Sequence, residues 1–420
     1  MGQGVTTAAD APSAIPAEDP SGLSPTDLEQ LRADTPGATI VHHLNNAGSA
    51  LPPQVVLDVM IGHLQREAQI GGYEAHAEVQ PQLDETYVSL GRLVGSGPEG
   101  ISLTTSATDS WVRGFLSIPL AAGDRLLVSQ AEYASNVLAI MAAAKRVGAT
   151  IDAIPDDSNG IVDVDALTDM LDERVKVVSI THAPSQNGLL NPAAEIGQAL
   201  HAAGSSAWYI LDACQSVGQM PLEAQAIGAD FISATGRKFL RGPRGTGFLW
   251  ASKRALELEP AIIDLHAAEW TAIDDYAISP GATRYESWEK SYAAMLGMGA
   301  AADYALNLGL DVIQRRITWL ADRIRQQLAA IPGVEVRDRG EHRTGIVVFC
   351  APGKDTEALV MAIKSGGVNV SFSPQNYARR DFGVYGAGEP TGYVRVSPHI
   401  YNDDSDIDAL IDVVRKSVRS

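Results

Sequence analysis

The sequence predicts an α/β fold: a larger domain with a mainly parallel sheet, followed by a smaller α+β domain. Three observations support this prediction. The chain has 420 residues, more than a single hydrophobic core usually holds. From residue 125, short apolar runs alternate with helical stretches, as in parallel sheets covered by helices on both faces. From residue 276 this rhythm gives way to a long helical region and then to short strands.

The elements of the larger domain follow one another in strict alternation. The apolar run "RLLVSQAEY" (125–133) predicts a strand, and "SNVLAIMAAAKRVG" after it predicts a helix. The same alternation continues through "ATIDAIPDD", "DVDALTDMLDERV", "KVVSITHAP", "AAEIGQALHAAG", "AWYILDACQSVG", "ADFISATGRKF" and "GTGFLWAS". We therefore assign residues 36–275 to the larger domain.

The two ends of the chain have different compositions. Residues 1–35 are rich in Ala, Pro, Asp and Ser, which predicts a mobile or loosely docked N-terminal arm. Residues 276–420 begin with the helical "WEKSYAAMLGMGAAADYALNLG". They continue with the strand patterns "GVEVRDRG", "GIVVFCAP", "VNVSFSP" and "GYVRVSPHIY". We assign this stretch to the small domain.

Charge and apolar pattern exclude several classes of partner. The formal net charge is −19 and no Lys/Arg-rich run occurs, which argues against nucleic acid and anionic membrane as partners. No apolar stretch reaches the length of a membrane span, and the N-terminus does not resemble a secretory signal, so we expect a cytoplasmic protein. Both cysteines, Cys214 and Cys350, lie in apolar runs typical of buried reduced thiols.

Candidate site residues follow the predicted strands, because ligands of open parallel sheets bind at the carboxyl ends of the strands. "LTTSATDSW" places Ser106, Ala107 and Thr108 where a strand ends and a helix begins, a position suited to an anion such as phosphate or to a simple helix cap. Asp212 ends the apolar strand of "YILDACQS" and needs a cationic or protonated partner.

Two further residues complete the set. Lys238 follows the strand of "DFISATGR", and Tyr133 presents an aromatic ring at the same end of the sheet. A phosphate site, a carboxylate for a protonated ring nitrogen, an aromatic cover and an amine that forms an imine together meet the requirements of pyridoxal phosphate. A cofactor-free α/β binding protein is the distant alternative.

At these residues the sequence resembles the class V aminotransferase and cysteine desulfurase-like family of fold-type I pyridoxal-phosphate enzymes. "LDACQSVGQMPL" and "SATGRKFLRGPRGTG" carry the resemblance, which extends over about residues 40–415. It implies the fold-type I transferase fold with a seven-stranded sheet, a homodimer, an amino-acid substrate and no metal site.

The resemblance also implies a role for each matching residue. Lys238 is the Schiff-base lysine, Asp212 pairs with the pyridinium nitrogen, and Tyr133 stacks on the ring. Gln215, with Ser185 or Gln186, reaches the ring hydroxyl. The remaining roles are phosphate binding by Ala107, Thr108, Thr235 and Arg237, α-carboxylate binding by Arg395, and lining of the substrate side by Asn46, Ala47 and Gly48.

Departures from the family pattern favour one reaction. Desulfurases usually carry histidines where this chain has Tyr133 and Arg237, and they take up sulfur on a cysteine that the stretch 373–392 lacks. The sequence most resembles the C–S lyase and isopenicillin N epimerase-like branch. This resemblance implies β-elimination from a cysteine S-conjugate or its sulfoxide, giving thiol, pyruvate and ammonia in sulfur-containing natural-product biosynthesis. A decarboxylating deaminase, an epimerase and an aminotransferase remain the alternatives.

Overall fold

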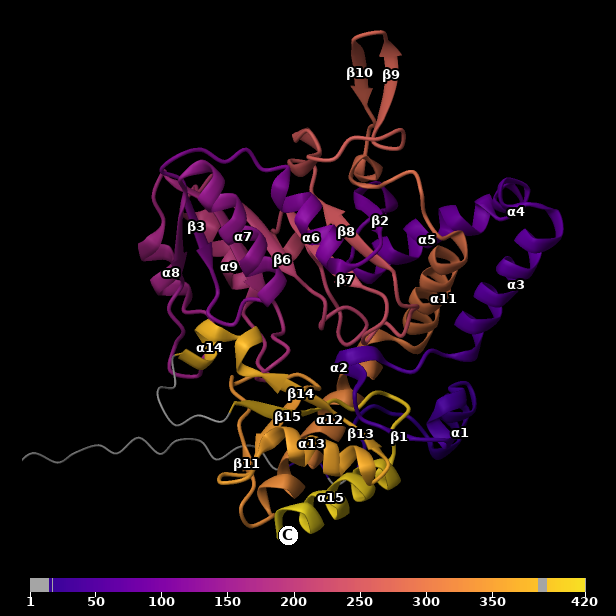
Figure 1. The fold of residues 1–420 in the computed structure, drawn as a ribbon, viewed down its shortest axis with the longest axis vertical. Helices are drawn as coiled ribbons and strands as arrows, with labels where there is room; N and C mark the ends of the chain where they lie inside the picture. The colour runs from indigo at the N-terminus through magenta and orange to yellow at the C-terminus, as the bar shows by residue number, and fades with distance from the viewer. Residues whose placement is uncertain (1–14, 17, 384–390, 420) are drawn as a thin grey trace, which may run out of the picture.

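A seven-stranded sheet forms the centre of the larger part of the molecule, in a computed structural model that describes residues 15, 16, 18–383 and 391–419 (Figure 1). The strands run in the order β2 (Ile101–Thr104), β8 (Gly247–Ala251), β7 (Phe231–Thr235), β6 (Trp208–Asp212), β5 (Val175–Thr181), β3 (Arg125–Val128) and β4 (Thr150–Ala153). Only β8 runs antiparallel to its neighbours in this sheet. The prediction of a mainly parallel seven-stranded sheet is confirmed.

Both faces of this sheet are covered, which explains why its strands are apolar throughout. Consecutive strand residues point to opposite faces, so Leu126 packs beneath Trp111 and Ile140, whereas Leu127 joins the core on the other side. One face is covered by α6 (Ala107–Leu116) and α7 (Ala134–Val147); the other is covered by α5 (Gln80–Leu93), α8 (Val164–Met170) and α9 (Ala193–Ala202). The short α10 (Ala224–Ile227) follows β6.

A second, antiparallel sheet of four strands lies in the C-terminal part of the described chain. Its order is β11 (Glu335–Val336), β12 (Val347–Cys350), β15 (Gly392–Val396) and β14 (Ser371–Pro374). A core of its own joins this sheet to α12 (Leu310–Ala329), α13 (Thr356–Ser365) and α15 (Asp404–Arg419). The smaller α+β unit predicted for the C-terminal end is thus present.

Several further elements lie outside these two sheets. The helix α11 (Tyr292–Leu308) packs against α5 and against the projecting α3 (Gln54–Ile70), which α4 (Gly72–Glu78) follows (Figure 1). The strand β1 (His42–His43) pairs with β13 (Val368–Asn369). The hairpin of β9 (Ala268–Ala272) and β10 (Asp275–Ile278) projects from the larger part. The predicted limit at residue 275 falls within this hairpin, and the domain limits stay a prediction.

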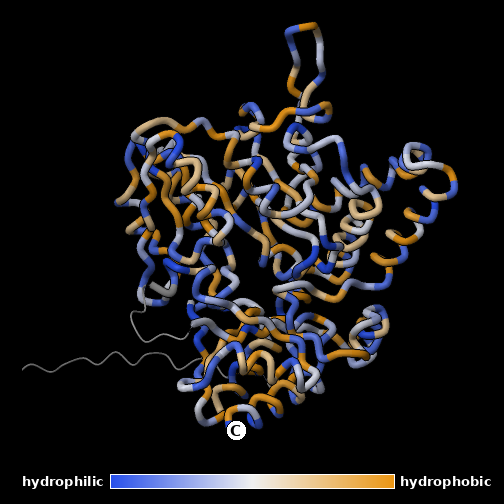
Figure 2. The backbone as a smooth tube through the Cα atoms, in the orientation of Figure 1, coloured by the Kyte–Doolittle hydropathy of each residue, from blue (hydrophilic) through white to orange (hydrophobic). Residues whose placement is uncertain are grey.

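The described portion of the N-terminal arm contacts the small unit. The helix α1 (Pro25–Ala33) begins with a capping box on Ser24, and Arg32 donates to the Tyr401 carbonyl at 3.1 Å. Arg316 pairs with Asp19 at 2.5 Å. Residues 1–14 and 17 of the predicted arm lie outside the described residues. In Figure 2 many apolar segments lie inside the two parts, and others lie on the projecting α3 and hairpin. Among the described helices, none has the length and apolar character of a membrane span.

Candidate active site

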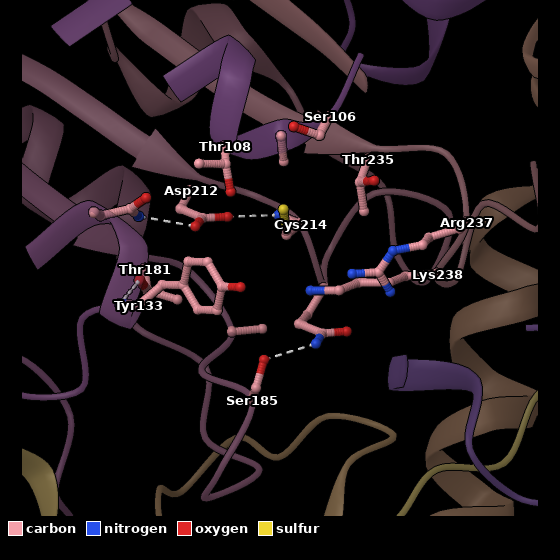
Figure 3. A pocket seen from close by; sticks show the side chains of 14 residues that line it. Ser106, Thr108, Tyr133, Thr181, Ser185, Asp212, Cys214, Thr235, Arg237 and Lys238 are labelled. Carbon is pink, nitrogen blue, oxygen red and sulfur yellow. Dashed lines mark hydrogen bonds between the residues drawn. The ribbon is translucent and has the colours of Figure 1, made fainter. Parts of the chain in front are cut away.

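A pocket opens at the carboxyl ends of the parallel strands, where the sequence predicts the site. The lining residues end or follow five strands, β2, β3, β5, β6 and β7, and Figure 3 shows labelled side chains that face this common space. The lining residues are Ser106, Ala107, Thr108, Tyr133, Asn136, Thr181, Ala183, Ser185, Asp212, Cys214, Gln215, Thr235, Arg237 and Lys238. The structure therefore brings together most of the residues that the sequence singles out.

Lys238 lies in a tight turn directly after β7. The carbonyl of Lys238 accepts from the Arg241 amide at 2.9 Å, and Gly242 donates to the Gly236 carbonyl at 2.7 Å. A Cβ on Gly236 would lie 2.3 Å from Thr246 Oγ1, so this turn requires glycine. The lysine is 8% exposed. Burial lowers the pKa of its amine, which favours the neutral, nucleophilic form.

Asp212 ends β6 and is held by neutral donors. Its Oδ2 accepts from the Asn136 amide at 2.9 Å, and its Oδ1 accepts from the Cys214 backbone N–H at 3.0 Å. The residue is 3% exposed. A buried carboxylate with neutral donors alone retains a strong preference for a cationic partner. The site therefore suits a ligand with a protonated ring nitrogen.

Tyr133 caps the beginning of α7 and presents its ring to the pocket. Its backbone N–H donates to Thr181 Oγ1 at 3.0 Å, and Thr181 donates to the buried Glu132 carboxylate at 2.6 Å. The Lys238 amine lies 5.9 Å from the centre of the Tyr133 ring. The anchored backbone fixes the ring at one side of the space between Lys238 and Asp212 (Figure 3).

The beginning of α6 forms the end of the pocket suited to an anion. Ser106 is the N-cap, and its hydroxyl accepts from the Asp109 amide at 3.1 Å. The next residues, Ala107 and Thr108, line the pocket, and the first N–H groups of a helix have no partner within the helix. Thr235 lies opposite and donates its hydroxyl to the Thr246 carbonyl at 3.1 Å. This arrangement can bind phosphate.

Gln215 presents an unsatisfied acceptor to the pocket. Its Nε2 donates to Ser185 Oγ at 2.8 Å and to the Ala47 carbonyl at 3.1 Å. Its buried Oε1 has no hydrogen-bond partner among the described residues. Ser185 lines the pocket, whereas Gln186 does not. Ser185 is therefore the better placed of the two residues that the sequence left open.

The residues predicted on the substrate side border the pocket through hydrogen bonds. Arg237 donates to the Gly48 carbonyl, and Arg395 donates to the Ser185 carbonyl at 3.4 Å. Burial lowers the pKa of Arg395 to about 10, and the nearby Arg237 adds to this effect. Two guanidinium groups close enough to repel one another favour an anionic ligand between them. Carboxylate binding by Arg395 and phosphate binding by Arg237 stay predictions.

The segment around α2 (Asn46–Ser49) contributes backbone rather than side chains to this border. Asn46 directs its amide to the Ser397 carbonyl at 2.7 Å, and its Oδ1 accepts from the Tyr401 hydroxyl at 2.5 Å. The Ala47 carbonyl accepts from Gln215, as described above. Substrate contact by Asn46, Ala47 and Gly48 stays a prediction.

Sequence reasoning missed Asn136, Thr181, Ala183 and Cys214 as pocket residues. Asn136 could have been found, because it lies one helical turn after Tyr133 and so shares its face of α7. Cys214 is partly exposed in the pocket rather than fully buried, whereas Cys350 is buried as predicted. Burial, with Asp212 adjacent, raises the pKa of the Cys214 thiol.

These observations test whether pyridoxal phosphate fits. The buried Lys238 amine and the Asp212 carboxylate face one space beside the Tyr133 ring, and the beginning of α6 closes one end of it. Gln215, whose Oε1 has no partner among the described residues, lines the same pocket. Each group matches one feature of the cofactor: its aldehyde, ring nitrogen, ring hydroxyl, ring face and phosphate. The residues fit. Among the described residues, no cluster of three or more His, Cys, Asp or Glu suits a metal ion.

Comparison with known proteins points the same way. The family model described as aminotransferase class-V matches residues 42–410. A probable cysteine desulfurase of Methanothermobacter thermautotrophicus is 27% identical over 389 residues, covering 91% of this chain and 96% of the relative. One from Xylella fastidiosa is 28% identical over 412 residues, covering 94% and 97%.

Solved structures share the fold. The apo cysteine desulfurase of Thermococcus onnurineus superposes with a TM-score of 0.84 at 22% identity, covering 93% of this chain and 98% of the other. The cystine C–S lyase C-DES, in complex with its product cysteine persulfide, gives 0.81 at 19% identity, covering 91% and 99%.

Proposed function

Because this chain belongs to the aminotransferase class-V family, with pyridoxal phosphate as its cofactor, we propose that it is a C–S lyase. Its substrate is a cysteine S-conjugate or the corresponding sulfoxide. For the conjugate, β-elimination followed by addition of one water releases the thiol, pyruvate and ammonia. The role in sulfur-containing natural-product biosynthesis is part of the same proposal.

The placement of the two cysteines is the observation that carries this proposal. A desulfurase must pass sulfur to a thiolate, since the thiolate and not the thiol is the nucleophile. Cys350 is 3% exposed within β12, and the raised pKa of Cys214 keeps that thiol protonated. The stretch 373–392 has no cysteine in the sequence, and its residues 384–390 lie outside the described part. The substrate sulfur is then expected to leave as a thiol, still bonded to its own substituent.

We assign the cofactor contacts to the residues placed above. Lys238 binds the cofactor through its amine, and Asp212 holds a proton at the ring nitrogen. Gln215 and Ser185 face the ring hydroxyl, while Tyr133 covers one ring face. Ala107, Thr108, Thr235 and Arg237 surround the phosphate end. When bound, pyridoxal phosphate supplies an electron sink for the bond broken at the substrate α-carbon.

The same residues perform the proton transfer and orient the substrate. Arg395 holds the substrate α-carboxylate, because a guanidinium can grip a carboxylate with two parallel hydrogen bonds. The proton then moves from the α-carbon to the Nζ of Lys238, whose lowered pKa leaves the amine free to accept it. Loss of the β-substituent as a thiol follows and requires no additional cysteine.

We also propose that the enzyme is a homodimer. The projecting α3 and α4 expose the large apolar side chains Ile61, Leu64 and Tyr73, and Trp288 is 51% exposed. Large apolar side chains exposed on projecting helices are typical of a subunit interface. The cytoplasmic location stays a prediction.

The proposal is tested by comparing two substrates on the purified holoenzyme. A cysteine S-conjugate is expected to yield pyruvate and thiol, whereas free cysteine is expected to yield no alanine. Alanine formed from free cysteine with sulfur retained on the protein would identify a desulfurase and overturn the proposal.

A further inference from the structure

A groove beside the cofactor pocket has no role in the function proposed above. It lies between the first turns of α7 and the segment 376–380, encloses about 610 Å³, and shares Tyr133 with the cofactor pocket. That volume lies in the range of ligand pockets. Tyr133 lines both cavities, so the groove lies next to the pocket that contains Lys238. We call it the α7 groove.

One wall of the α7 groove is apolar and open to solvent. Leu138 and Met141 lie three residues apart on one face of α7 and are 66% and 51% exposed. Tyr377 lines the groove from the segment 376–380 and is 64% exposed. Large apolar side chains gathered around one groove mark a binding surface more often than isolated exposed ones do.

The other end of the α7 groove is cationic. Arg379 and Arg380 begin α14 (Arg379–Gly383) and line the groove. The adjacent carboxylate, Asp381, is buried and engaged by Arg339 and by the Asn187 amide. Within residues 15–16, 18–383 and 391–419, no carboxylate pairs with the guanidinium of Arg379 or Arg380. Two guanidinium groups beside an apolar wall favour a ligand whose apolar body ends in an anion.

We propose that the α7 groove binds the S-substituent of the substrate, and that this substituent has an apolar chain ending in a carboxylate. The inference rests on the proposed function, in which Arg395 holds the substrate α-carboxylate and Lys238 accepts the α-proton. A second carboxylate on the substituent then meets Arg379 and Arg380, and the chain between packs on Leu138 and Met141. Specificity for the conjugate is thereby set outside the cofactor pocket.

Two probes that differ only in charge test this inference on the holoenzyme. They are S-carboxybutyl cysteine and its side-chain amide. The Kd of each is read from the change in visible cofactor absorbance on binding, which does not depend on the bond that is broken afterwards. The acid is expected to bind at least about tenfold more tightly, equal to about 1.4 kcal/mol. A charge-assisted hydrogen bond accounts for a difference of this size.

Variants locate the preference. The ratio of the amide Kd to the acid Kd measures the preference for the acid. The double variant Arg379→Ala/Arg380→Ala is expected to bring this ratio close to one. Leu138→Glu is expected to lower the ratio, because the new carboxylate repels the acid. The matched control is Arg146→Ala, because Arg146 is exposed on α7 and does not line the groove. This variant is expected to keep the wild-type ratio. The cofactor absorbance reports that each variant is folded and loaded.

The outcomes separate this inference from the proposed function. Equal Kd values in the wild type, binding of neither probe, or an unchanged ratio in the double variant would each overturn the groove assignment. Pyruvate is measured in parallel. The acid probe could bind more tightly than the amide through Arg379 and Arg380 while no pyruvate is formed. That result would support the groove assignment and refute the lyase proposal.

Discussion

The Asn136 side-chain amide donates a hydrogen bond to Asp212 at 2.9 Å, and so joins the first turn of α7 to the end of β6. Asn136 also donates to Glu132 at 2.9 Å, the residue before Tyr133. One amide therefore fixes the position of the carboxylate that we assign to the ring nitrogen, together with the backbone that carries the proposed stacking ring.

This arrangement makes turnover depend on the charge of Asp212. Asp212→Asn retains the size of the side chain but removes the negative charge that keeps a ring nitrogen protonated. We expect the kcat of this variant to fall by at least about 100-fold, which corresponds to about 2.7 kcal/mol. Asp169→Asn, at an exposed position on α8, serves as the control. A loss smaller than about tenfold would argue against the pairing.

Lys238 is the second residue on which activity depends. Lys238→Ala is expected to abolish turnover and the visible absorbance of the lysine-bound cofactor, because the pocket has no other lysine among its lining residues. Far-ultraviolet circular dichroism should match that of the wild type, and Lys253→Ala, at an exposed position, should remain active. Near-normal activity in Lys238→Ala would contradict the assignment.

Much of the site follows from strand order alone. Asp212 ends a strand of the mainly parallel sheet, and Lys238, Tyr133 and Thr108 follow soon after other strands of it. The carboxyl ends of parallel strands meet at one edge. Periodicity and turn residues therefore bring them together without knowledge of any long-range contact.

The remainder depends on contacts between distant segments that periodicity does not encode. The hydrogen bond from Arg395 to the Ser185 carbonyl joins residues 210 positions apart in the sequence. The helix α11 packs against α3 and α5. Its sequence is apolar on all sides, so periodicity does not indicate which side meets them. Asn46 directs its side chain to Ser397 and Tyr401. Side-chain direction of this kind is set by tertiary packing.

Acid stability should depend on His399. Its Nε2 donates to the Phe239 carbonyl at 2.9 Å and its Nδ1 accepts from the Ile400 N–H at 2.8 Å, so the neutral ring fits this site. Burial lowers its pKa from 6.5 to about 3. Between these values the unfolded state binds more protons than the folded state, and the free energy of unfolding falls as the pH falls.

The measurement is urea unfolding of wild type and His399→Gln at several pH values from 7 to 3.5. The stability difference between them should shrink on acidification by up to about 1.4 kcal/mol per pH unit below pH 6.5. The other buried histidines with a lowered pKa, His43 and His182, are common to both proteins. Parallel pH profiles would show that His399 does not contribute.

The homodimer depends on the apolar surface of α3 and α4. Leu64 and Tyr73 are 52% and 76% exposed, so Leu64→Glu/Tyr73→Glu should fold but place charge in the proposed interface. Light scattering is expected to report a dimer for the wild type and a monomer for the variant. The same double substitution on the outer surface of α13, Met361→Glu/Lys364→Glu, where both residues are exposed, should leave a dimer. An active monomeric wild type would refute the prediction.

The products from a single cysteine S-conjugate test the central claim most directly. Thiol, pyruvate, ammonia, alanine and carbon dioxide are quantified together after incubation with the holoenzyme, without an added keto acid. The C–S lyase account predicts thiol, pyruvate and ammonia in equal amounts, with neither alanine nor carbon dioxide. Stoichiometric carbon dioxide with the C–S bond intact would contradict it and identify a decarboxylating deaminase.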